Sequence, residues 1–362
     1  MKELRIKDIC DKGSSNLKQK DVEGKNGQYP VYGASGIISH IDTYHQEENY
    51  IAIVKDGSGI GRVTFMPAKS SVIGTMQYIL PKEGFNINYI GYCLQSLDLS
   101  KYKQGAAIPH IYFRDYGERI VKVTEDTKEQ QSIVDYLDAA FAKIDAMKAN
   151  AEKALNEAKA LFQASLKEML EPKEGWEEKQ LGEVCELSQG LAINSKTRYL
   201  LKETGQLPLL RIKDMKDGTR EVFVDEKNCP QNCIANEDDI IYTRTGTLGL
   251  VFTGMKGVLH NNCFKITFNN SILEKSFFMY FLSHEAFRSS IIKLASRAAQ
   301  PDITHKLFKT QEIVFPSILE QKRIAEILDS LKSKVDRLQS NFEKISQECD
   351  ALKQALLRQI FE

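Results

Sequence analysis

The sequence predicts an α+β fold in which two similar mixed α/β domains are related by pseudo-twofold symmetry and joined by two long helices forming an antiparallel coiled coil. Three observations predict it. A 43-residue stretch occurs twice, each copy has the heptad spacing of a long helix, and each follows short β runs with glycine turns. The expected order is therefore domain, long helix, domain, long helix.

The duplication sets the domain boundaries. Residues 129–171, which begin EQQSIVDYLDAAFAKID, align without a gap with 320–362, which begin EQKRIAEILDSLKSKVD, and 17 of the 43 positions are identical. Upstream, GAAIPHI at 105–111 matches RAAQPDI at 297–303. The predicted parts are a first globular domain at 1–126, a first long helix at 127–172, a second globular domain at 173–318 and a second long helix at 319–362.

Apolar residues at alternating spacings of four and three define the seam of each helix, and neither run contains Gly or Pro. In the first helix they include Ile133, Leu137, Ile144, Met147 and Leu161, with alanines at 140, 151, 154 and 158 between them. In the second they include Ile324, Leu328, Leu331, Val335, Leu338, Phe342, Ile345 and Leu352. Small residues facing large ones favour a close antiparallel pair. The alternative is that each helix packs only on its own globular domain.

Each globular domain shows strand, glycine turn and strand, at 49–66 in the first and 238–254 in the second. A further strand follows at 77–81 and 263–268, and then an amphipathic helix at 87–99 and 275–295. Each domain is therefore expected to be mixed α and β.

Composition indicates a cytoplasmic protein. The 362 residues include no stretch of eighteen apolar residues, and the N-terminus lacks the apolar core of a signal peptide. The seven cysteines are an odd number without zinc-site spacing, so we expect reduced thiols and no metal. Net charge is zero, but Lys and Arg outnumber Asp and Glu nine to five at 55–122 and nine to three at 240–311. Two local basic regions of this kind suit nucleic acid.

No catalytic motif is found. The glycines of DGSGIGR alternate between two strands and do not open a helix, which argues against a dinucleotide site. There is no Walker sequence and no Pro-Pro pair of the kind an adenine methyltransferase loop needs, and EGK at 23–25 lacks the upstream Pro-Asp of a nuclease. The sequence therefore predicts a binding protein and not an enzyme.

The doubled helix entry resembles the conserved regions of the specificity subunit of type I restriction-modification systems, where such regions follow two target recognition domains. YPVYGASGIISHIDTY (29–44) with DGSGIGRVTF (56–65) is similar to one type of target recognition domain, and GLAINSKTRYLLKETGQLPLLRIKDMKDG (190–218) resembles another. The resemblance implies a non-catalytic subunit that reads a bipartite, asymmetric target in double-stranded DNA. It also implies modification (methyltransferase) and restriction subunits as partners, and no cofactor on this chain: S-adenosylmethionine, ATP and magnesium are expected on those partners.

Base-reading residues vary within this family, so candidates follow from residue chemistry. Lys and Arg suit phosphates and guanine, Asn and Gln suit adenine, and Ser and Thr suit either role. In the first domain we select Lys55, Ser58, Arg62, Gln104, His110 and Arg114. In the second we select Arg211, Lys213, Arg244, Thr245, Asn261, Asn262, Arg297, Gln300 and Lys306. Arg62, Arg244 and Arg297 are preferred because they lie in or beside loops of small residues.

Two other classes of protein stay open at this point. A freestanding coiled-coil scaffold explains the helices but not two basic, loop-rich domains. A freestanding two-headed DNA-binding protein without methyltransferase partners explains the domains but not the matching helices. Copurification with partner subunits distinguishes these classes.

Overall fold

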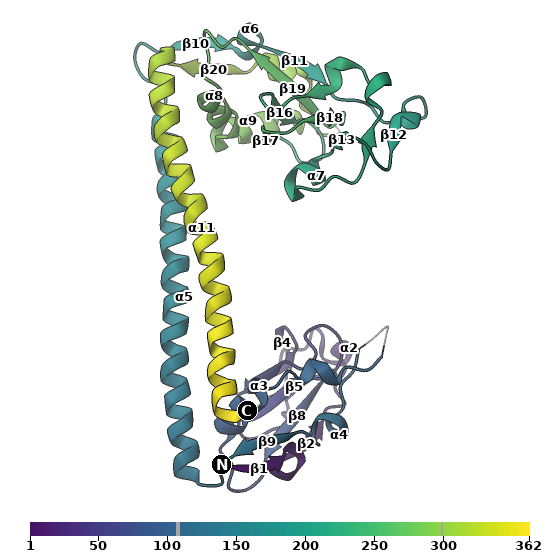
Figure 1. Ribbon diagram of the computed structural model, residues 1–362, viewed down its shortest axis with the longest axis vertical. Helices are drawn as coiled ribbons and strands as arrows, with labels where there is room; N and C mark the ends of the chain where they lie inside the picture. Colours follow the sequence, from purple (N-terminus) through teal and green to yellow (C-terminus); the bar gives the residue numbers. More distant parts are fainter. Residues whose placement is uncertain (106–108, 298–299) are drawn as a thin grey trace. The chain divides into compact units, whose positions relative to one another are not determined.

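The computed structural model describes residues 1–105, 109–297 and 300–362 (Figure 1). The chain forms two compact units, each described by itself below. Unit 1 comprises Met1–Lys153 and Ser340–Glu362, and unit 2 comprises Ala154–Gln339. Each unit thus contains part of both long helices, α5 (Thr127–Leu170) and α11 (Ile318–Phe361).

Unit 1 is built on a four-stranded antiparallel sheet in the order β2-β8-β5-β6, whose central strand β5 is buried along its whole length. Its strands are β2 (Cys10–Ser14), β5 (Tyr50–Val54), β6 (Val63–Met66) and β8 (Met76–Pro81). A second sheet has the order β4-β3-β7, from β3 (Tyr29–Gly33), β4 (Gly36–Ile41) and β7 (Ser71–Val72). A ribbon pairs β1 (Lys2–Arg5) with β9 (Ile120–Val123).

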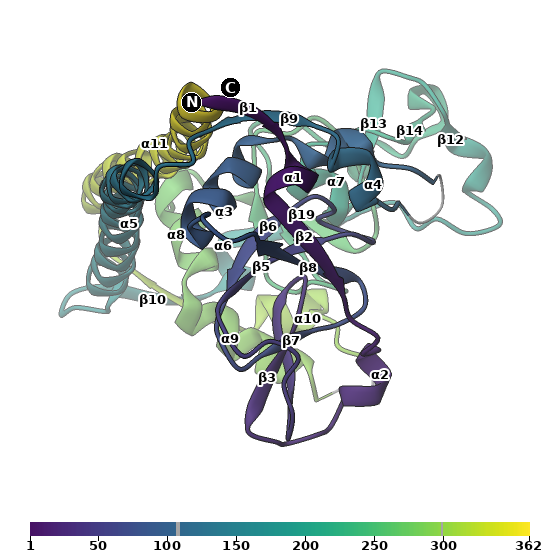
Figure 2. The same ribbon diagram turned by 90° about the horizontal axis from the view of Figure 1, so that it is seen from below.

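The helices of unit 1, apart from α5 and α11, are short. They are α1 (Ile6–Ile9), α2 (Gln19–Val22), α3 (Ile87–Ser96), the 3-10 helix η1 (Leu99–Tyr102) and α4 (Phe113–Tyr116). Asn86 caps α3 by accepting hydrogen bonds from the backbone N–H groups of Asn88 and Tyr89. Figure 2 shows α3 beside β5 and β6, where it covers the main sheet.

Unit 2 repeats this frame. Its main sheet has the order β11-β19-β16-β17, and the ribbon pairs β10 with β20. These strands are β10 (Glu177–Gln180), β11 (Cys185–Gln189), β16 (Ile240–Thr243), β17 (Val251–Phe252), β19 (Cys263–Phe268) and β20 (Glu312–Phe315). The helices are α6 (Leu181–Val184), α7 (Ile212–Asp217), α8 (Lys275–Ser283), α9 (Glu285–Ala295) and α10 (His305–Lys309), with 3-10 helices η2 (Arg198–Leu200), η3 (Glu226–Asn228) and η4 (Gln231–Cys233).

The second sheets of the two units share a parallel pair, β3 with β7 in unit 1 and β13 with β18 in unit 2, but they differ in size. Unit 2 has five strands in the order β12-β14-β13-β18-β15. They are β12 (Leu201–Lys202), β13 (Leu207–Leu210), β14 (Phe223–Val224), β15 (Ile234–Ala235) and β18 (Gly257–Leu259). The mixed α/β character that the sequence predicts for each half is therefore confirmed.

A fully buried glutamine makes equivalent contacts at the start of each long helix. In unit 1, Gln130 accepts from Asn86 N (2.7 Å) and donates to the carbonyls of Gly84 and Thr124, both at 3.0 Å. In unit 2, Gln321 accepts from Glu274 N (2.8 Å) and donates to two backbone carbonyls at 2.8 and 2.9 Å. A buried amide must find such partners, and these fix each long helix to its own sheet domain.

The long helices pack against each other in opposite directions within each unit. In unit 1, Lys353 Nζ lies 2.6 Å from Asp145 Oδ1, and Lys148 Nζ lies 3.5 Å from Asp350 Oδ1. Residue numbers therefore increase along α5 in the direction in which they decrease along α11. In unit 2, Lys159 Nζ donates to Gln339 Oε1 (2.7 Å), while Leu166 of α5 and Leu328 of α11 share one core. The predicted antiparallel pairing is confirmed within each unit.

The helices also complete the cores of the units. Val134 and Leu137 of α5 and Leu357 and Phe361 of α11 belong to the core of unit 1. Tyr89 contacts both ends of the chain, because its ring lies 5.2 Å from that of Phe361 and its hydroxyl 3.9 Å from Met1 Sδ. Pairing with the other helix and packing on the globular part are therefore both present.

The predicted seam of the first helix is wrong at Met147 and Leu161, which are 59% and 60% exposed. The next residues, Lys148 and Phe162, are half-buried and buried. The covered row of α5 is Leu137, Phe141, Ile144, Lys148, Ala151, Leu155, Ala158 and Phe162, with Ile133 half-buried before it. A heptad pattern accepts either of two adjacent positions, and burial favours Phe141 and Leu155 over the alanines beside them because they remove more apolar surface from water.

The predicted seam of the second helix is wrong at Leu352, whose side chain is 48% exposed. Lys353 takes the covered position, with its ammonium 5.3 Å from the centroid of the Phe141 ring and bonded to Asp145. The stem of a lysine can lie on apolar surface while its charge finds a partner, which apolar spacing alone does not reveal. The earlier seam positions are buried at Ile324 and Leu328, and half-buried at Leu331, Val335, Leu338, Phe342 and Ile345.

The single amphipathic helix expected at 275–295 is two helices, because His284 is extended (φ −63°, ψ 135°) and ends α8 before α9 begins. The turn brings the rings of Phe281 and Phe287 to 4.7 Å. The apolar periodicity indicates one continuous helix, but the chain bends at His284 and the two rings pack against each other across the bend.

All seven cysteines are buried free thiols. Burial raises the pKa of Cys10 and of Cys185, which begin the equivalent strands β2 and β11, to about 12. Cys229 and Cys233 belong to a small core of unit 2 and also have raised pKa values because of burial. None of the helices in the described part of the chain is long and apolar enough to cross a membrane.

Candidate nucleic-acid interface

In unit 1 the candidate residues gather around the hairpin loop 55–62, which joins β5 to β6. The loop turns sharply at Gly61, whose φ is +85° and whose N–H donates to Val54 O (2.8 Å). A Cβ at Gly61 would lie 2.9 Å from Ser100 N, so only glycine fits there without displacing backbone. Within this loop, Lys55 is half-buried and Ser58 is exposed.

Residues 109–112 are hydrogen-bonded to this hairpin loop, and we call them the tie segment of unit 1. Ile111 N donates to Lys55 O (2.9 Å), and Gly57 N donates to Pro109 O (3.2 Å). His110 Nδ1 donates to Asp56 Oδ1 (2.6 Å). Residues 55 to 57 are thus held to the tie segment by backbone bonds and by one pair of side chains.

His110 also begins a stack of planar side chains. Its ring is stacked on that of Tyr112 (centroids 6.3 Å apart, planes at 25°), and the guanidinium of Arg114 lies 4.7 Å from the Tyr112 centroid. Arg114 is 72% exposed and its Nε lies 3.6 Å from Asp115 Oδ1, so both the Tyr112 ring and this carboxylate hold a guanidinium that still faces solvent. Tyr112, 43% exposed, was not selected from the sequence; its position two residues from both His110 and Arg114 was the available signal.

The other two candidates of unit 1 make structural contacts. Gln104 exchanges two backbone hydrogen bonds with His110, both 2.8 Å, and its side chain donates to Asp115 Oδ2 (2.9 Å). Arg62 is exposed at the end of the hairpin loop and donates to Ala34 O (2.9 Å), in the turn between β3 and β4. Arg62 therefore connects the two sheets of unit 1 while leaving part of its guanidinium accessible.

In unit 2 the equivalent hairpin loop is 244–250, between β16 and β17, and its tie segment is 301–304. Ile303 N donates to Arg244 O (2.9 Å), and Arg244 N donates to Asn262 O (2.8 Å). The Arg244 guanidinium binds both carboxylate oxygens of Asp302, through Nε (2.9 Å) and through a terminal nitrogen. Arg244 is only 17% exposed, and its guanidinium is engaged in this bidentate bond rather than facing solvent as the sequence suggested for a base-reading group.

The remaining candidates near this loop are half-buried. Thr245 N donates weakly to Asn262 O (3.4 Å), Asn262 N donates to His260 Nδ1 (3.3 Å), and Gln189 Nε2 donates to Asn261 O (3.1 Å). Burial lowers the pKa of His260, and Arg211 lowers it further. These residues lie together behind the loop, with their backbone groups holding its shape.

Arg211 and Lys213 belong to a separate network. Arg211 bonds Asp214 (2.5 Å) and Glu221 (2.7 Å), while Lys213 lies 3.6 Å from Glu221. The Arg211 guanidinium holds the pKa of Asp214 below its ordinary value. Both carboxylates thus neutralise the basic groups that the sequence indicated as DNA contacts.

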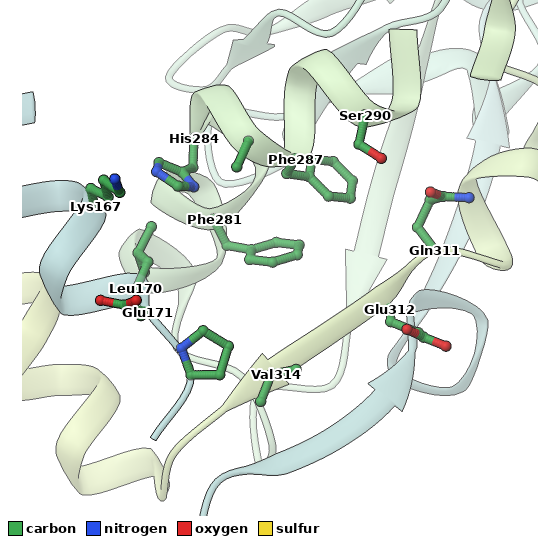
Figure 3. A pocket seen from close by; sticks show the side chains of 12 residues that line it. Lys167, Leu170, Glu171, Phe281, His284, Phe287, Ser290, Gln311, Glu312 and Val314 are labelled. Atoms are coloured by element: carbon green, nitrogen blue, oxygen red, sulfur yellow. The ribbon is translucent and has the colours of Figure 1, made fainter. Parts of the chain in front are cut away.

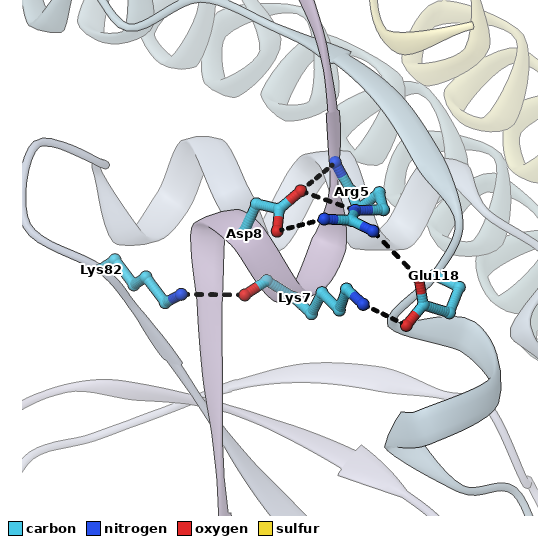
Figure 4. A network of polar contacts seen from close by, with 5 residues as sticks. All are labelled: Arg5, Lys7, Asp8, Lys82 and Glu118. Carbon is cyan, nitrogen blue, oxygen red and sulfur yellow. Dashed lines mark hydrogen bonds and ion pairs between the residues drawn. The ribbon is translucent and has the colours of Figure 1, made fainter.

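The same network occurs in the frame of unit 1, where it has a structural position at the start of α1 (Figure 4). Arg5 bonds Asp8 (2.9 Å) and lies 3.6 Å from Glu118, and Lys7 also pairs with Glu118. Both networks arise from the pentapeptide LRIKD, at 4–8 and at 210–214. The recurrence favours a helix-start function for Arg211.

Three candidates of unit 2 are exposed: Arg297, Gln300 and Lys306. Lys306 lies in α10, which follows the tie segment as α4, with Arg114, follows it in unit 1. The centres of the repeated stretches GAAIPHI and RAAQPDI, residues 106–108 and 298–299, lie outside the described residues. Arg114 and Lys306 are thus exposed cations in the short helices that follow the two tie segments.

A cavity of about 410 Å³ also lies in unit 2, at the bend between α8 and α9 (Figure 3). Its lining combines the apolar side chains of Leu170, Phe281 and Phe287 with the polar groups of Lys167 and His284. Burial lowers the pKa of His284. No residue selected for DNA binding lines this cavity.

Two frames of one topology, each with a glycine hairpin loop held to a tie segment and with its own part of the paired long helices, define a protein built by duplication of one fold. The chain belongs to the type I restriction modification DNA specificity domain family, whose model matches residues 1–157 and 173–346. Both halves of the chain are thus covered by the same kind of domain.

Characterised relatives agree. The chain is 26% identical over 192 residues to the type I restriction enzyme MjaVIII specificity subunit of Methanocaldococcus jannaschii, covering 52% of this chain and 42% of the relative. It is 28% identical over 194 residues to the EcoKI specificity subunit of Escherichia coli K12, covering 51% and 42%. The matched part is therefore about half of this chain and less than half of each relative.

Solved structures share the fold. A chain from a structural study of complex assembly and conformational transition of the type I R-M system has a TM-score of 0.76 and 18% identity, covering 98% of this chain and 96% of that one. The HsdS subunit from Thermoanaerobacter tengcongensis has a TM-score of 0.58 and 17% identity, covering 98% and 95%.

Proposed function

We propose that this chain is the specificity subunit of a type I restriction-modification complex and reads a bipartite, asymmetric target in double-stranded DNA. The observation that carries this proposal is that both units contain the same main sheet and ribbon, whereas their second sheets differ. Each frame presents a hairpin loop and a tie segment, so each unit reads one half-site. Because the loops and second sheets differ, the two half-sites differ in sequence.

The duplicated frame suits a split target. Paired readers bind half-sites on one face of the duplex when these are spaced by about one helical turn, roughly 34 Å, or a multiple of it. We assign recognition to the predicted domains at 1–126 and 173–318, and spacing to the helices at 127–172 and 319–362. We propose a cytoplasmic location, which follows from DNA as the proposed ligand.

We further propose that the chain is not catalytic. Modification subunits, carrying S-adenosylmethionine, and restriction subunits, carrying ATP and magnesium, would assemble on it. The sequence supports this division because it contains none of the catalytic loops that methyl transfer, DNA cleavage or ATP hydrolysis require. The alternative is a freestanding two-headed DNA-binding or scaffold protein. It does not account for the match of both halves of the chain to the specificity domain family.

The proposal is tested by the methylated motif. A host strain that lacks endogenous methylation would express the modification subunits with or without this chain, and its genome would be sequenced for methylated bases. We expect methylation at a split motif only when the chain is present. Partner-free protein that transfers methyl groups, or a chain that does not copurify with the modification subunits, would contradict the proposal.

A module exchange tests the division of the target. Residues 176–304, which include both the hairpin loop and the tie segment of unit 2, would be replaced by the equivalent unit of a relative with a different target. We expect one half of the methylated motif to change, while the other half and the spacer are retained. A change in both halves would show that recognition is not divided between the units.

A further inference from the structure

The first two residues of the two hairpin loops correspond. Lys55 N and Asp56 N both donate to Thr75 O, at 3.0 and 3.2 Å, just as Arg244 N and Thr245 N both donate to Asn262 O. Thr75 and Asn262 each precede the first residue of the equivalent strands β8 and β19. The backbone therefore aligns residues 55–56 with 244–245.

The tie segments align in the same way. Ile111 N donates to Lys55 O and Ile303 N donates to Arg244 O, both at 2.9 Å. His110 and Asp302, which precede these isoleucines, consequently occupy the same place in the two frames. Each of them bonds a side chain of its own hairpin loop, at Asp56 in unit 1 and at Arg244 in unit 2.

The direction of this side-chain bond is opposite in the two units. In unit 1 the accepting carboxylate belongs to the hairpin loop and the donor to the tie segment. In unit 2 the donor belongs to the hairpin loop and the accepting carboxylate, Asp302, to the tie segment. Asp56 and Asp302 are 23% and 28% exposed, so neither bond is a freely solvated surface pair.

We propose that the Asp56–His110 and Arg244–Asp302 pairs are positioning residues that set half-site specificity, each by holding its hairpin loop to its tie segment. This inference rests on the proposed function and names the groups behind it. Neither pair needs to touch a base. Each fixes where the exposed groups beside it meet DNA: Ser58 and the Tyr112–Arg114 stack in unit 1, and the segment leading to Lys306 in unit 2.

The geometry explains why an indirect role is large enough to matter. A bidentate arginine–carboxylate bond fixes both distance and orientation. When one partner of such a part-buried pair is removed, the other is left without its bond and the loop gains alternative positions. Base contacts need hydrogen bonds of defined length, so a displaced loop loses discrimination before the fold is lost.

Opposite donor direction also makes the elements non-interchangeable. A hairpin loop of unit 1 placed against the tie segment of unit 2 would bring Lys55, which is aligned with Arg244, and Asp56 beside the Asp302 carboxylate. The single ammonium of Lys55 cannot reproduce the bidentate bond of Arg244, and the Asp56 carboxylate repels that of Asp302. Hairpin loop and tie segment must therefore be exchanged together when a recognition unit is replaced.

The test uses the assembled complex in cells, with the methylated motif and the methylation rate at single-mismatch sites as readouts. The variant is Asp302→Asn, which keeps the size of the side chain but removes the carboxylate. The matched control is Asp238→Asn, a fully exposed carboxylate of the same unit. We expect Asp302→Asn to lower discrimination at the half-site of unit 2 about tenfold, within the range one base contact supplies, and to leave the other half-site unchanged.

A reversed pair provides the rescue. Arg244→Asp combined with Asp302→Arg restores a donor and an acceptor in the order of unit 1, and should recover part of the lost discrimination relative to either single change. If Asp302→Asn prevents assembly, discrimination at the unit 2 half-site is measured for Arg244→Lys instead. This variant retains the positive charge and removes only the bidentate geometry. The melting temperature of each purified variant shows whether the fold is intact.

Two results are decisive against the inference. If Asp302→Asn and Arg244→Lys both leave the discrimination at the unit 2 half-site unchanged, the pair does not position the loop. If Asp302→Asn relaxes both half-sites equally, its effect is general destabilisation. Failure of the wild-type complex to methylate any split motif would instead contradict the proposed function itself, so the two failures are distinguishable.

Discussion

Units 1 and 2 build the same four-stranded main sheet and the same ribbon, but the second sheet has three strands in unit 1 and five in unit 2. The shared part contains the backbone bonds of the hairpin loop and the buried glutamine at the start of each long helix. The differing part contains the segment between β2 and β5 in unit 1 and the segment between β11 and β16 in unit 2. Divergence is thus concentrated away from the groups that hold the frame together.

The helix-start network extends this comparison to a single pentapeptide. LRIKD begins α1 in the frame of unit 1 and α7 in the insert of unit 2, and it forms the same Arg–Asp–Glu–Lys contacts. The surroundings differ, since Asp8 is 38% exposed and Asp214 is 1% exposed. Local sequence therefore determines the contacts, while tertiary burial determines their energetic weight.

The comparison between equivalent positions of the long helices predicts the largest effect. Leu137 and Leu328 are fully buried in the cores of units 1 and 2. Leu137→Ala and Leu328→Ala should each lower the free energy of unfolding by about 3–5 kcal/mol, since they remove buried methyl groups and leave a cavity. Leu161→Ala and Leu352→Ala, at exposed positions, should cost no more than about 0.5 kcal/mol. Urea unfolding of the four variants decides whether the shifted seam is correct.

The buried glutamines give the next effect. Gln130→Ala and Gln321→Ala each remove three backbone partners from a dry site, which should cost about 2–3 kcal/mol. Their exposed neighbours serve as controls, because Gln131→Ala and Lys322→Ala should change stability by less than about 0.5 kcal/mol. Similar losses in the two units are expected from equivalent bonds. A large loss in only one unit, measured by hydrogen exchange, would show that the duplicated entry has diverged in function.

Sequence periodicity was sufficient to predict the long helices and three of the four main strands of each unit, and the small and large residues of the two seams indicated the antiparallel pairing. The first main strands, β2 and β11, were not predicted. It failed at Met147 and Leu161 because a heptad pattern cannot choose between adjacent positions without knowing which side chain the partner helix can cover. The two-residue strands of the second sheets, such as β12 and β14, were not predicted, since they are too short to show any alternation.

The sequence indicated the glycine hairpin loops but not the contacts of their side chains. Each hairpin loop is hydrogen-bonded to its tie segment, which lies far from it in the sequence, and this contact was not predicted. The neutralisation of Arg244 could not be read from the sequence, because Asp302 is 58 residues away and the acidic group was not expected beside a DNA contact. Tyr112 was missed because an exposed tyrosine has no sequence signature of its own.

The network at Asp214 predicts a pH-dependent effect of intermediate size. Asp214→Asn removes a carboxylate that accepts from Arg211 and from Thr219 Oγ1 (3.0 Å), so we expect a loss of about 1–2 kcal/mol at pH 7. The pKa of Asp214 is lowered by folding, so its stabilisation is present above the unfolded-state pKa of about 3.9 and is lost as pH falls through the lower folded value.

The difference between wild type and Asp214→Asn should therefore shrink as the pH is lowered from 7 into this range, as measured by thermal unfolding. Asp8→Asn in unit 1 is the matched comparison, and its effect should be smaller because the side chain is more exposed. A difference that stays constant with pH would mean that the amide substitution acts through packing and not through charge.

The smallest effect concerns the exposed cations after the two tie segments. Arg114→Ala and Lys306→Ala should each weaken binding of the purified complex to random-sequence duplex DNA by about three- to tenfold, because phosphate contacts act on every sequence. Each should also make the dependence of log Kd on log salt concentration shallower by about 0.9, as expected for the loss of one neutralised phosphate. Lys332→Ala, on the α11 surface where its ammonium pairs with Asp336 at 2.7 Å, is the control and should alter neither quantity. A weaker affinity with an unchanged salt slope would show that Arg114 and Lys306 shape their loops and do not contact phosphate, and an effect of Arg114→Ala alone would restrict phosphate contact to the Tyr112 stack of unit 1.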